Sequence, residues 1–282
     1  MGQVNIANNT YSNKIRKKHR REQKIRRIKH ALYCIIGIAA LCFGIILWGR
    51  NTLLRGQGQL SWFGENTSQK RVETLKLESK NYPEALQNML ERNEETAEFV
   101  SQYPNRAQYQ ENEIDISKEI ETDKVPLFLQ WDLRWGYHNY GDEFIGVAGC
   151  GPVCMSMASV FLTGNTDENP SQMAKFAYEQ GYYTQEGTSW SFFTEGAGKL
   201  GLQGKELGLS ETEIKQVLDQ RGVVICSMRP GDFTTTGHFV LLRGYDEKGF
   251  YVNDPNSEKN SEKQWSYQTL SSQIKCLWGI SQ

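Results

Sequence analysis

The chain has 282 residues, with 32 basic and 33 acidic side chains and a formal net charge of −1. Its 26 glycines, seven prolines and six cysteines exclude a collagen-like chain and a dense disulfide scaffold, and the near-neutral total argues against nucleic acid as the main partner. The charge is unevenly spread, however. Residues 1–30 hold ten Lys or Arg against one acid, which gives +9, and the other 252 residues sum to −10.

Residues 31–48, ALYCIIGIAALCFGIILW, follow this basic head and contain no charged side chain. As a helix, these 18 residues would extend about 27 Å, close to the thickness of a bilayer's hydrocarbon core. Tyr33 and Trp48 near the ends suit the membrane interface. Because the segment lacks the small-residue cleavage site of a signal peptide, we interpret it as an uncleaved transmembrane signal anchor. A buried core helix is the alternative.

The basic residues before this segment predict a cytoplasmic N-terminus and an extracellular remainder. The expected localisation is therefore the cell membrane, in a single-pass arrangement. We expect the head, residues 1–30, to contact anionic lipid, whereas a nucleic-acid arm or a localisation signal is the alternative. No nucleic-acid partner is expected.

Four segments are predicted along the chain. They are a basic cytoplasmic head (1–30), a transmembrane signal anchor (31–48), an extracellular tether with a helical stalk (49–119) and a compact domain (120–282). The sequence leaves open whether residues 82–123 act as a spacer or as an inhibitory segment.

The apolar periodicity predicts an α+β domain after residue 120, because helical patterns come first and strand patterns follow. Helices are predicted over residues 82–100, 152–162, 171–180, 189–200 and 211–220. Strands are predicted over residues 222–228, 238–245 and 249–253, with a turn at 246–249 between the last two.

The motif Gly149-Cys150-Gly151-Pro152 opens the first predicted helix of the compact domain. A cysteine at a helix N-terminus faces unpaired N–H groups and the positive end of the helix dipole, and both favour the thiolate. We therefore predict Cys150 as a nucleophile, with Gly149 allowing close approach of a substrate. An ordinary buried thiol is the alternative.

A thiolate nucleophile needs a base, and the base needs an orienting acceptor. His238 begins an apolar strand after a glycine-containing loop, whereas His138 lies in a polar run and is expected at the surface. Asp254 follows the next strand, and a hairpin centred near residue 246 would place it opposite His238. The alternatives are a core histidine and an aspartate that forms a turn before Pro255.

Gln130 is the candidate side-chain donor for an oxyanion, together with the backbone N–H of Cys150. A surface amide is the alternative. Trp190 and Gly237 are candidate substrate contacts, although a core tryptophan is as plausible for the first. No cofactor is expected, and no metal, because no Cys/His pairs occur at ligand spacing.

The other cysteines allow two interpretations each. Cys154 lies one helical turn after Cys150 and is interpreted as a small core residue, with modulation of the nucleophile as the alternative. Cys226 and Cys276 form either a disulfide or two buried free thiols, and the sequence does not decide between them.

The order Gln130, Cys150, His238, Asp254 resembles the papain-like cysteine peptidases, and in detail the C39-like peptidase family of bacterial surface and secreted proteins. The resemblance implies a papain-like fold with the nucleophile helix packed on an antiparallel sheet. It implies that Cys150 is the nucleophile and His238 the base. It also implies that Asp254 orients the histidine and that Gln130 donates to the oxyanion. A segment like residues 82–104 precedes the domain in clostridial-type relatives. The matching pieces are VPLFLQWDLRWG (125–136), GCGPVCMSM (149–157), GTSW (187–190), GDFTTTGHFVLLRGY (231–245) and FYVNDPNS (250–257).

These features together predict a cell-surface cysteine peptidase that hydrolyses peptide bonds in peptide or protein substrates. No P-loop and no multi-span region accompany the domain, which argues against leader processing coupled to export. Two alternatives remain: a peptidoglycan-peptide hydrolase or transpeptidase, and a non-catalytic surface module that binds peptides.

Overall fold

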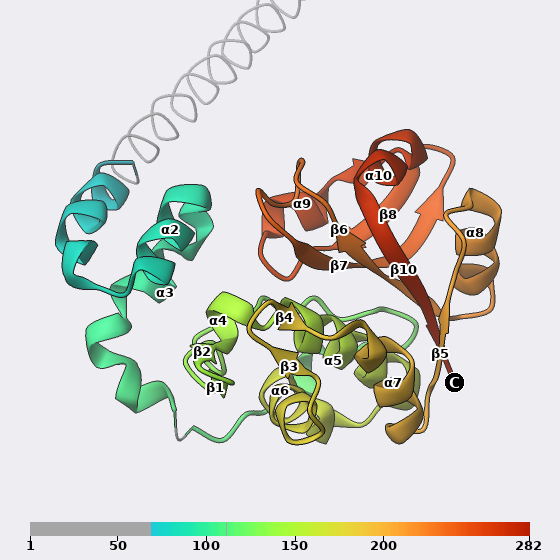
Figure 1. The fold of residues 1–282 in the computed structure, drawn as a ribbon, viewed down its shortest axis with the longest axis horizontal. Helices are drawn as coiled ribbons and strands as arrows, with labels where there is room; N and C mark the ends of the chain where they lie inside the picture. The colour runs from blue at the N-terminus through green and yellow to red at the C-terminus, as the bar shows by residue number, and fades with distance from the viewer. Residues whose placement is uncertain (1–68, 111) are drawn as a thin grey trace, which may run out of the picture. The chain divides into compact units, whose positions relative to one another are not determined.

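The computed structural model describes residues 69–110 and 112–282. Residues 72–282 form one compact unit around a six-stranded antiparallel sheet with the strand order β5-β10-β6-β7-β8-β9 (Figure 1). Two short hairpins, β1–β2 and β3–β4, lie outside this sheet. The main strands are β5 Gln203–Glu206, β6 Val223–Met228, β7 His238–Asp246, β8 Gly249–Asn253, β9 Gln264–Trp265 and β10 Ile274–Ser281; the hairpins are Asn139–Tyr140 with Glu143–Phe144, and Tyr183–Thr184 with Gly187–Thr188.

Helices cover both faces of the sheet, because its buried strands carry apolar side chains on each face. One core joins the sheet to α5 and α6, and the other joins it to α8 and α10. The helices of this region are α4 Ile145–Ala148, α5 Cys150–Thr163, α6 Pro170–Glu179, α7 Glu195–Lys199, α8 Glu211–Asp219, α9 Glu258–Glu262 and α10 Tyr267–Gln273, with 3₁₀ turns η4 Ser117–Glu119, η5 Thr166–Glu168 and η6 Trp190–Phe193.

Helix α5 is the central helix, and all its residues from Gly151 to Val160 are buried. A helix that is apolar on every side needs neighbours all round, and here the sheet, α4 and α6 supply them. The helix ends at Gly164, which adopts the left-handed conformation with φ of 73° that glycine accepts readily. The predicted α+β class, with the helix of Cys150 packed on an antiparallel sheet, is confirmed.

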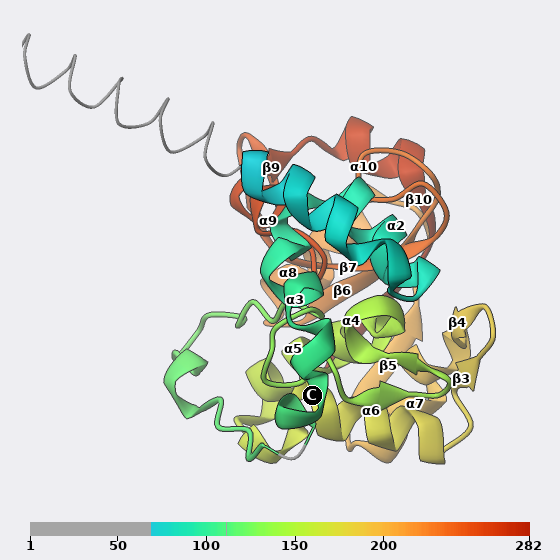
Figure 2. The ribbon, with the colours of Figure 1, turned by 90° about the vertical axis from the view of Figure 1, so that its left-hand side faces the viewer.

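Residues 79–109 form short helices beside α4 and α9 (Figures 1 and 2). They are η1 Ser79–Asn81, α2 Glu84–Arg92, η2 Glu94–Thr96, α3 Ala97–Ser101 and η3 Tyr103–Tyr109. The single helix predicted over 82–100 is broken at Asn93, whose extended backbone and side chain cap the next turn. The helix predicted over 189–200 is likewise divided, into η6 and α7. The predicted boundary at residue 119 stays a prediction.

The predicted transmembrane segment, residues 31–48, lies outside the described residues, as does the basic head. Within residues 69–110 and 112–282, no helix is long and apolar enough to cross a membrane. Helix α5, with 14 residues, extends about 21 Å, short of the roughly 30 Å of a hydrocarbon core. This finding contradicts the predicted localisation as a single-pass cell-membrane protein with an extracellular catalytic domain. The predicted membrane partner and anionic-lipid contact are likewise without support.

Candidate active site

Cys150 is the first residue of α5 and is half-buried. The helix therefore begins at the cysteine itself, two residues before the predicted start, and the predicted position of Cys150 at a helix N-terminus is confirmed. Gly149 joins α4 to α5, and its N–H donates to Ile145 O at 2.8 Å. The position of Cys150 is thus fixed by a helix on each side.

The two glycines beside Cys150 are required by packing. A Cβ on Gly149 would lie 2.6 Å from Ile145 Cγ2, and one on Gly151 would lie 2.6 Å from Thr188 Cβ. Both distances are shorter than real side chains allow. Gly149 is buried, so this contact with α4 gives a structural reason for the glycine, and its predicted contact with substrate stays a prediction.

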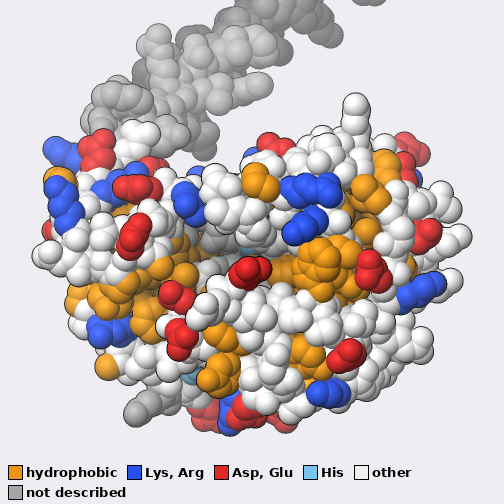
Figure 3. Space-filling view, in the orientation of Figure 1, with side chains coloured by type: hydrophobic (Ala, Val, Ile, Leu, Met, Phe, Trp, Pro, Cys, Tyr) orange, Lys and Arg blue, Asp and Glu red, His pale blue; other side chains and the backbone are white. Residues whose placement is uncertain are grey.

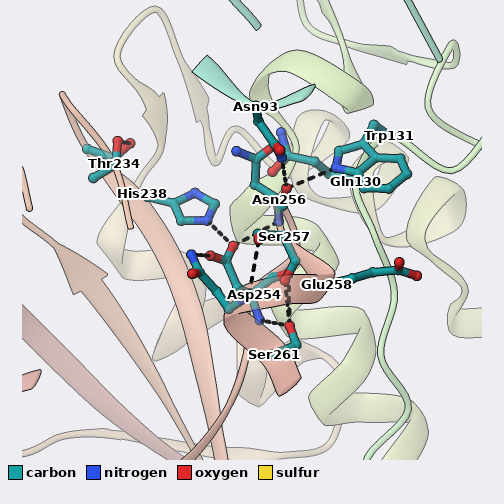
Figure 4. Close-up of polar contacts among 12 residues, drawn as sticks. Asn93, Gln130, Trp131, Thr234, His238, Asp254, Asn256, Ser257, Glu258 and Ser261 are labelled. Atoms are coloured by element: carbon teal, nitrogen blue, oxygen red, sulfur yellow. Dashed lines mark hydrogen bonds and ion pairs between the residues drawn. The ribbon is translucent and has the colours of Figure 1, made fainter. Parts of the chain in front are cut away.

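His238 and Asp254 form a buried pair (Figure 4), in which His238 Nε2 lies 2.7 Å from Asp254 Oδ1. Their side chains are only 7% and 1% exposed, so water screens the pair little. The structure thus brings together the two residues predicted as base and orienter.

The predicted register of this pair is wrong, although the contact exists. Strands β7 and β8 pair Asp246 with Gly249, so the turn is centred between residues 247 and 248. An irregularity between Leu242 and Gly244 then shifts the pairing by one residue, and Leu241 lies opposite Asn253. His238 is instead opposite Met228 of β6, and Asp254 reaches it from just beyond the end of β8.

Asp254 is fully buried, and its carboxylate has partners besides His238. The N–H of Asn256 donates to Oδ1 at 2.9 Å, and Asn260 Nδ2 donates to Oδ2 at 2.8 Å. The N–H of Asp254 donates to Ser261 Oγ at 2.9 Å. A buried carboxyl group needs hydrogen-bond partners, and besides the imidazole Asn256 and Asn260 supply them from the chain after β8.

His238 has a raised pKa. Burial is the largest single effect and opposes the charged imidazolium, but the Asp254 carboxylate, by its charge and its hydrogen bond, and a hydrogen bond with Cys150 outweigh it. Together they raise the pKa of His238 to about 10. Because Nε2 is bonded to Asp254, Nδ1 is the ring nitrogen left to interact with Cys150. The site therefore favours a protonated imidazole at His238.

Gln130 is buried rather than at the surface, with 5% of its area exposed. Its Nε2 donates to Gly146 O at 2.8 Å, and its N–H donates to Pro255 O at 2.7 Å. Gln130 thus links α4, one helical turn before Cys150, to the loop that carries Asp254. Its Oε1 is buried and has no hydrogen-bond partner among the residues that the structure describes.

Trp190 is 41% exposed and packs edge-on against Trp278, with ring centroids 5.6 Å apart. Lys275 Nζ lies 5.1 Å from the centre of the Trp190 ring. Gly237 is exposed, and no atom of the described residues lies within 4 Å of a Cβ added to it. Apolar side chains gather beside a hollow near the middle of the face shown in Figure 3, with charged side chains at its rim. Trp190 is therefore not a core residue, and contact of both residues with substrate stays a prediction.

The prediction that His138 lies at the surface is wrong, because the residue is half-buried. Its ring nitrogens lie 2.6 Å from Ser171 Oγ and 2.9 Å from Tyr109 O. Burial lowers the pKa of His138, against the hydrogen bond with Tyr109. The residue ties α6 to η3.

Cys226 and Cys276 are free thiols, which decides between the two sequence interpretations. They lie on the paired strands β6 and β10 but belong to cores on opposite faces of the sheet. Burial raises the pKa of both thiols, that of Cys276 to about 11. Cys154 is a fully buried core residue, and burial raises its pKa as well.

The sequence pointed to none of the polar side chains that hold the loop after Asp254. Ser257 caps α9 by accepting from the N–H of Asn260 at 3.1 Å, and a serine three residues before a polar residue is at most a weak helix-start signal. Asn93 and Glu95 contact this loop from more than 160 residues earlier in the chain. Such distant pairs leave no local pattern.

Comparison with known proteins gives a family, and among solved structures it gives a chain of limited similarity. Residues 122–280, more than half of the chain, match the model of the Peptidase_C39 like family. A solved chain from Bacillus anthracis, described as a candidate C39-like peptidase, is 17% identical. The match covers 57% of this chain and 96% of that one, with a TM-score of 0.35. No curated protein matches the chain.

Proposed function

Because the chain belongs to the Peptidase_C39 like family, we propose that it is a cysteine peptidase that hydrolyses peptide bonds, with Cys150 as nucleophile. The observation that carries this proposal is the buried bond of 2.7 Å between His238 Nε2 and Asp254 Oδ1, on an imidazole whose pKa both Asp254 and Cys150 raise. A peptidase family implies peptide or protein substrates.

In the proposed reaction, the imidazolium of His238 stabilises the thiolate of Cys150. The sulfur attacks the carbonyl carbon of a peptide bond and forms a tetrahedral intermediate. His238 then gives its proton to the leaving amine, and the C–N bond breaks to leave a thioester on Cys150. Neutral His238 then takes a proton from water, and the oxygen attacks the thioester carbon. The C–S bond breaks, the acid product leaves, and the thiolate–imidazolium pair with which the reaction began is restored.

Asp254 holds the imidazole in this scheme. Its bond to Nε2 keeps Nδ1 directed to the sulfur and the leaving group, and its charge favours the imidazolium. The carboxylate stays in place because Asn256 and Asn260 donate to it.

Gln130 is the proposed side-chain donor to the oxyanion, together with the backbone N–H of Cys150. An amide nitrogen carries two hydrogens; Gln130 Nε2 donates to Gly146 O at 2.8 Å and, over a longer distance of 3.4 Å, to Val147 O, so donation to an oxyanion would replace the longer bond. The bond to Gly146 O fixes the amide relative to α4 and so to the start of α5. Gly149, Gly237 and Trp190 are the proposed contacts for the rest of the substrate.

The test is hydrolysis of a mixed peptide pool by the full chain and by Cys150→Ala, with Cys276→Ala as the matched control. We expect cleavage by the wild type and by Cys276→Ala, and none by Cys150→Ala. Equal cleavage in Cys150→Ala would refute the proposal. Purified peptidoglycan and an added amine acceptor distinguish the alternatives, since cleavage of wall peptides alone indicates a wall hydrolase and transfer to the amine indicates a transpeptidase.

A further inference from the structure

Glu95 lies outside the region matched to the family, residues 122–280, yet it contacts the loop that follows Asp254. Its Oε1 accepts from Ser257 Oγ at 2.6 Å, and its Oε2 accepts from the N–H of Glu258 at 2.9 Å. A longer bond of 3.3 Å comes from the N–H of Lys259. One half-buried carboxylate therefore holds three consecutive residues.

Asn93 supports the same loop from the same turn of chain (Figure 4). Its Nδ2 donates to Asn256 O, which also accepts from Trp131 Nε1 at 3.0 Å. Its Oδ1 caps the turn by accepting from the N–H of Glu95 at 3.0 Å. Asn93 thus fixes the backbone of Glu95 and also binds the loop that Glu95 contacts.

The loop so held supplies the donors that fix Asp254. Asn256 N–H bonds to Oδ1, and Asn260 Nδ2 bonds to Oδ2. Asn260 is placed in turn by its N–H bond to Ser257 Oγ, the group that donates to Glu95. Helix α9 has only five residues, too few to be stable without such contacts.

We propose that Glu95 is a positioning residue for the active site: through Ser257 and the start of α9 it holds Asp254 in the orientation that directs His238 toward Cys150. The inference rests on the proposed function for the roles of those three residues. It gives part of residues 82–123, which the sequence leaves as a spacer or an inhibitory segment, a supporting role in the site.

The kinetic test uses the full chain with Glu95→Ala and Glu95→Gln. Glu91→Ala is the matched control, because Glu91 is an exposed glutamate on α2, one turn earlier. We expect kcat for peptide hydrolysis to fall about tenfold or more in Glu95→Ala, with KM within about twofold. Glu95→Gln should lose less, because an amide oxygen still accepts the Ser257 hydroxyl. Values equal to those of Glu91→Ala overturn the proposal, as does a rise in KM at unchanged kcat.

A second readout does not depend on turnover. Histidine-selective NMR titration, with His238 identified by its loss in His238→Gln, measures the pKa of the imidazole in each variant. A looser Asp254 stabilises the imidazolium less, so we expect the pKa of His238 to fall by about one unit in Glu95→Ala and to stay unchanged in Glu91→Ala. A purely structural role would leave this pKa at the wild-type value in the folded variant, and that result overturns the proposal.

Ser257→Ala covers the case in which Glu95→Ala does not fold. This variant removes the hydroxyl that donates to Glu95 and caps α9, so we expect kcat to fall severalfold or more with KM within about twofold. A kcat equal to that of the wild type overturns the proposal. The reaction of Cys150 with iodoacetamide in the wild type separates the two ideas. A wild-type rate no faster than that of a free thiol refutes the proposed function. If the wild type reacts fast and Glu95→Ala reacts at the same rate, only the role of Glu95 is refuted.

Discussion

His238 reaches Asp254 across 2.7 Å although the two residues are not opposite each other in the sheet. Leu241 faces Asn253 in the paired strands, so Val240 would be level with Asp254 if the pairing continued. Diagonal neighbours of this kind are within reach of long side chains only when both are well oriented. The bond therefore depends on the loop after β8 more than on the strand pairing.

Asp254→Asn removes the charge of this pair and keeps its shape. We expect kcat to fall about a hundredfold or more, and the alkaline limit of kcat/KM to move to lower pH, because Asp254 is the group that raises the pKa of His238. The pH dependence of kcat/KM measures both effects. Asp246→Asn, at the exposed end of the same hairpin, is the control and should match the wild type. An unmoved alkaline limit in Asp254→Asn would contradict the assignment.

The raised pKa of His238 also predicts how stability depends on pH. A pKa that rises on folding, here from 6.5 to about 10, contributes stability that is fully present below about pH 6.5 and is lost as pH rises through about 10. Urea unfolding at pH 6 and pH 10 should show a larger loss in the wild type than in His238→Gln, by at most a few kcal/mol. If the difference in unfolding free energy between the wild type and His238→Gln does not change with pH, the His238–Asp254 pair does not raise the pKa as described.

Gly151→Ala tests the packing beneath Cys150. The new Cβ would meet Thr188, so we expect a loss of about 1–3 kcal/mol in the free energy of unfolding and a lower kcat, because the start of α5 must move. Gly198→Ala is the matched helical control, since nothing lies within 4 Å of its Cβ. That variant should be about 0.5–1 kcal/mol more stable. Chemical denaturation measures both, and equal stabilities would refute the packing argument.

Trp190→Ala tests the proposed substrate contact. The ring is 41% exposed beside Trp278 and Lys275, so its removal should raise KM severalfold with little change in kcat. Leu209→Ala, which removes a side chain with 47% exposure, is the control and should leave KM unchanged. Peptide hydrolysis across a range of substrate concentrations gives both constants. An unaltered KM in Trp190→Ala places the substrate elsewhere.

Elements with strong local patterns were predictable from the sequence. Helix α5 and strands β6, β7 and β8 follow from apolar periodicity and glycine boundaries, and the structure places them within two residues of the predicted limits. Strand β10 was missed because its partners, β5 and β6, lie about 50 to 70 residues earlier in the chain. The short helices α9 and α10 were missed because tertiary contacts, rather than their own sequence, stabilise them.

Within the candidate site, too, local features could be predicted from the sequence and long-range contacts could not. A cysteine between glycines and a histidine at the start of an apolar strand are visible in the sequence. The predicted hairpin register was wrong because a bulge near Arg243 cannot be read from residues that all suit a strand. The bond between Glu95 and Ser257 joins residues 162 positions apart, and only the folded chain brings them together.

The central claim is that Cys150 carries the acyl group of the substrate, and intact-mass measurement tests it most directly. The full chain is mixed with a peptide ester, quenched in acid within the first turnover and digested to locate any added mass. We expect one acyl group on the peptide that contains Cys150, labile to hydroxylamine, and none in Cys150→Ala. Ester hydrolysis that proceeds at the wild-type rate in Cys150→Ala, with no adduct on Cys150 in the wild type, would contradict it.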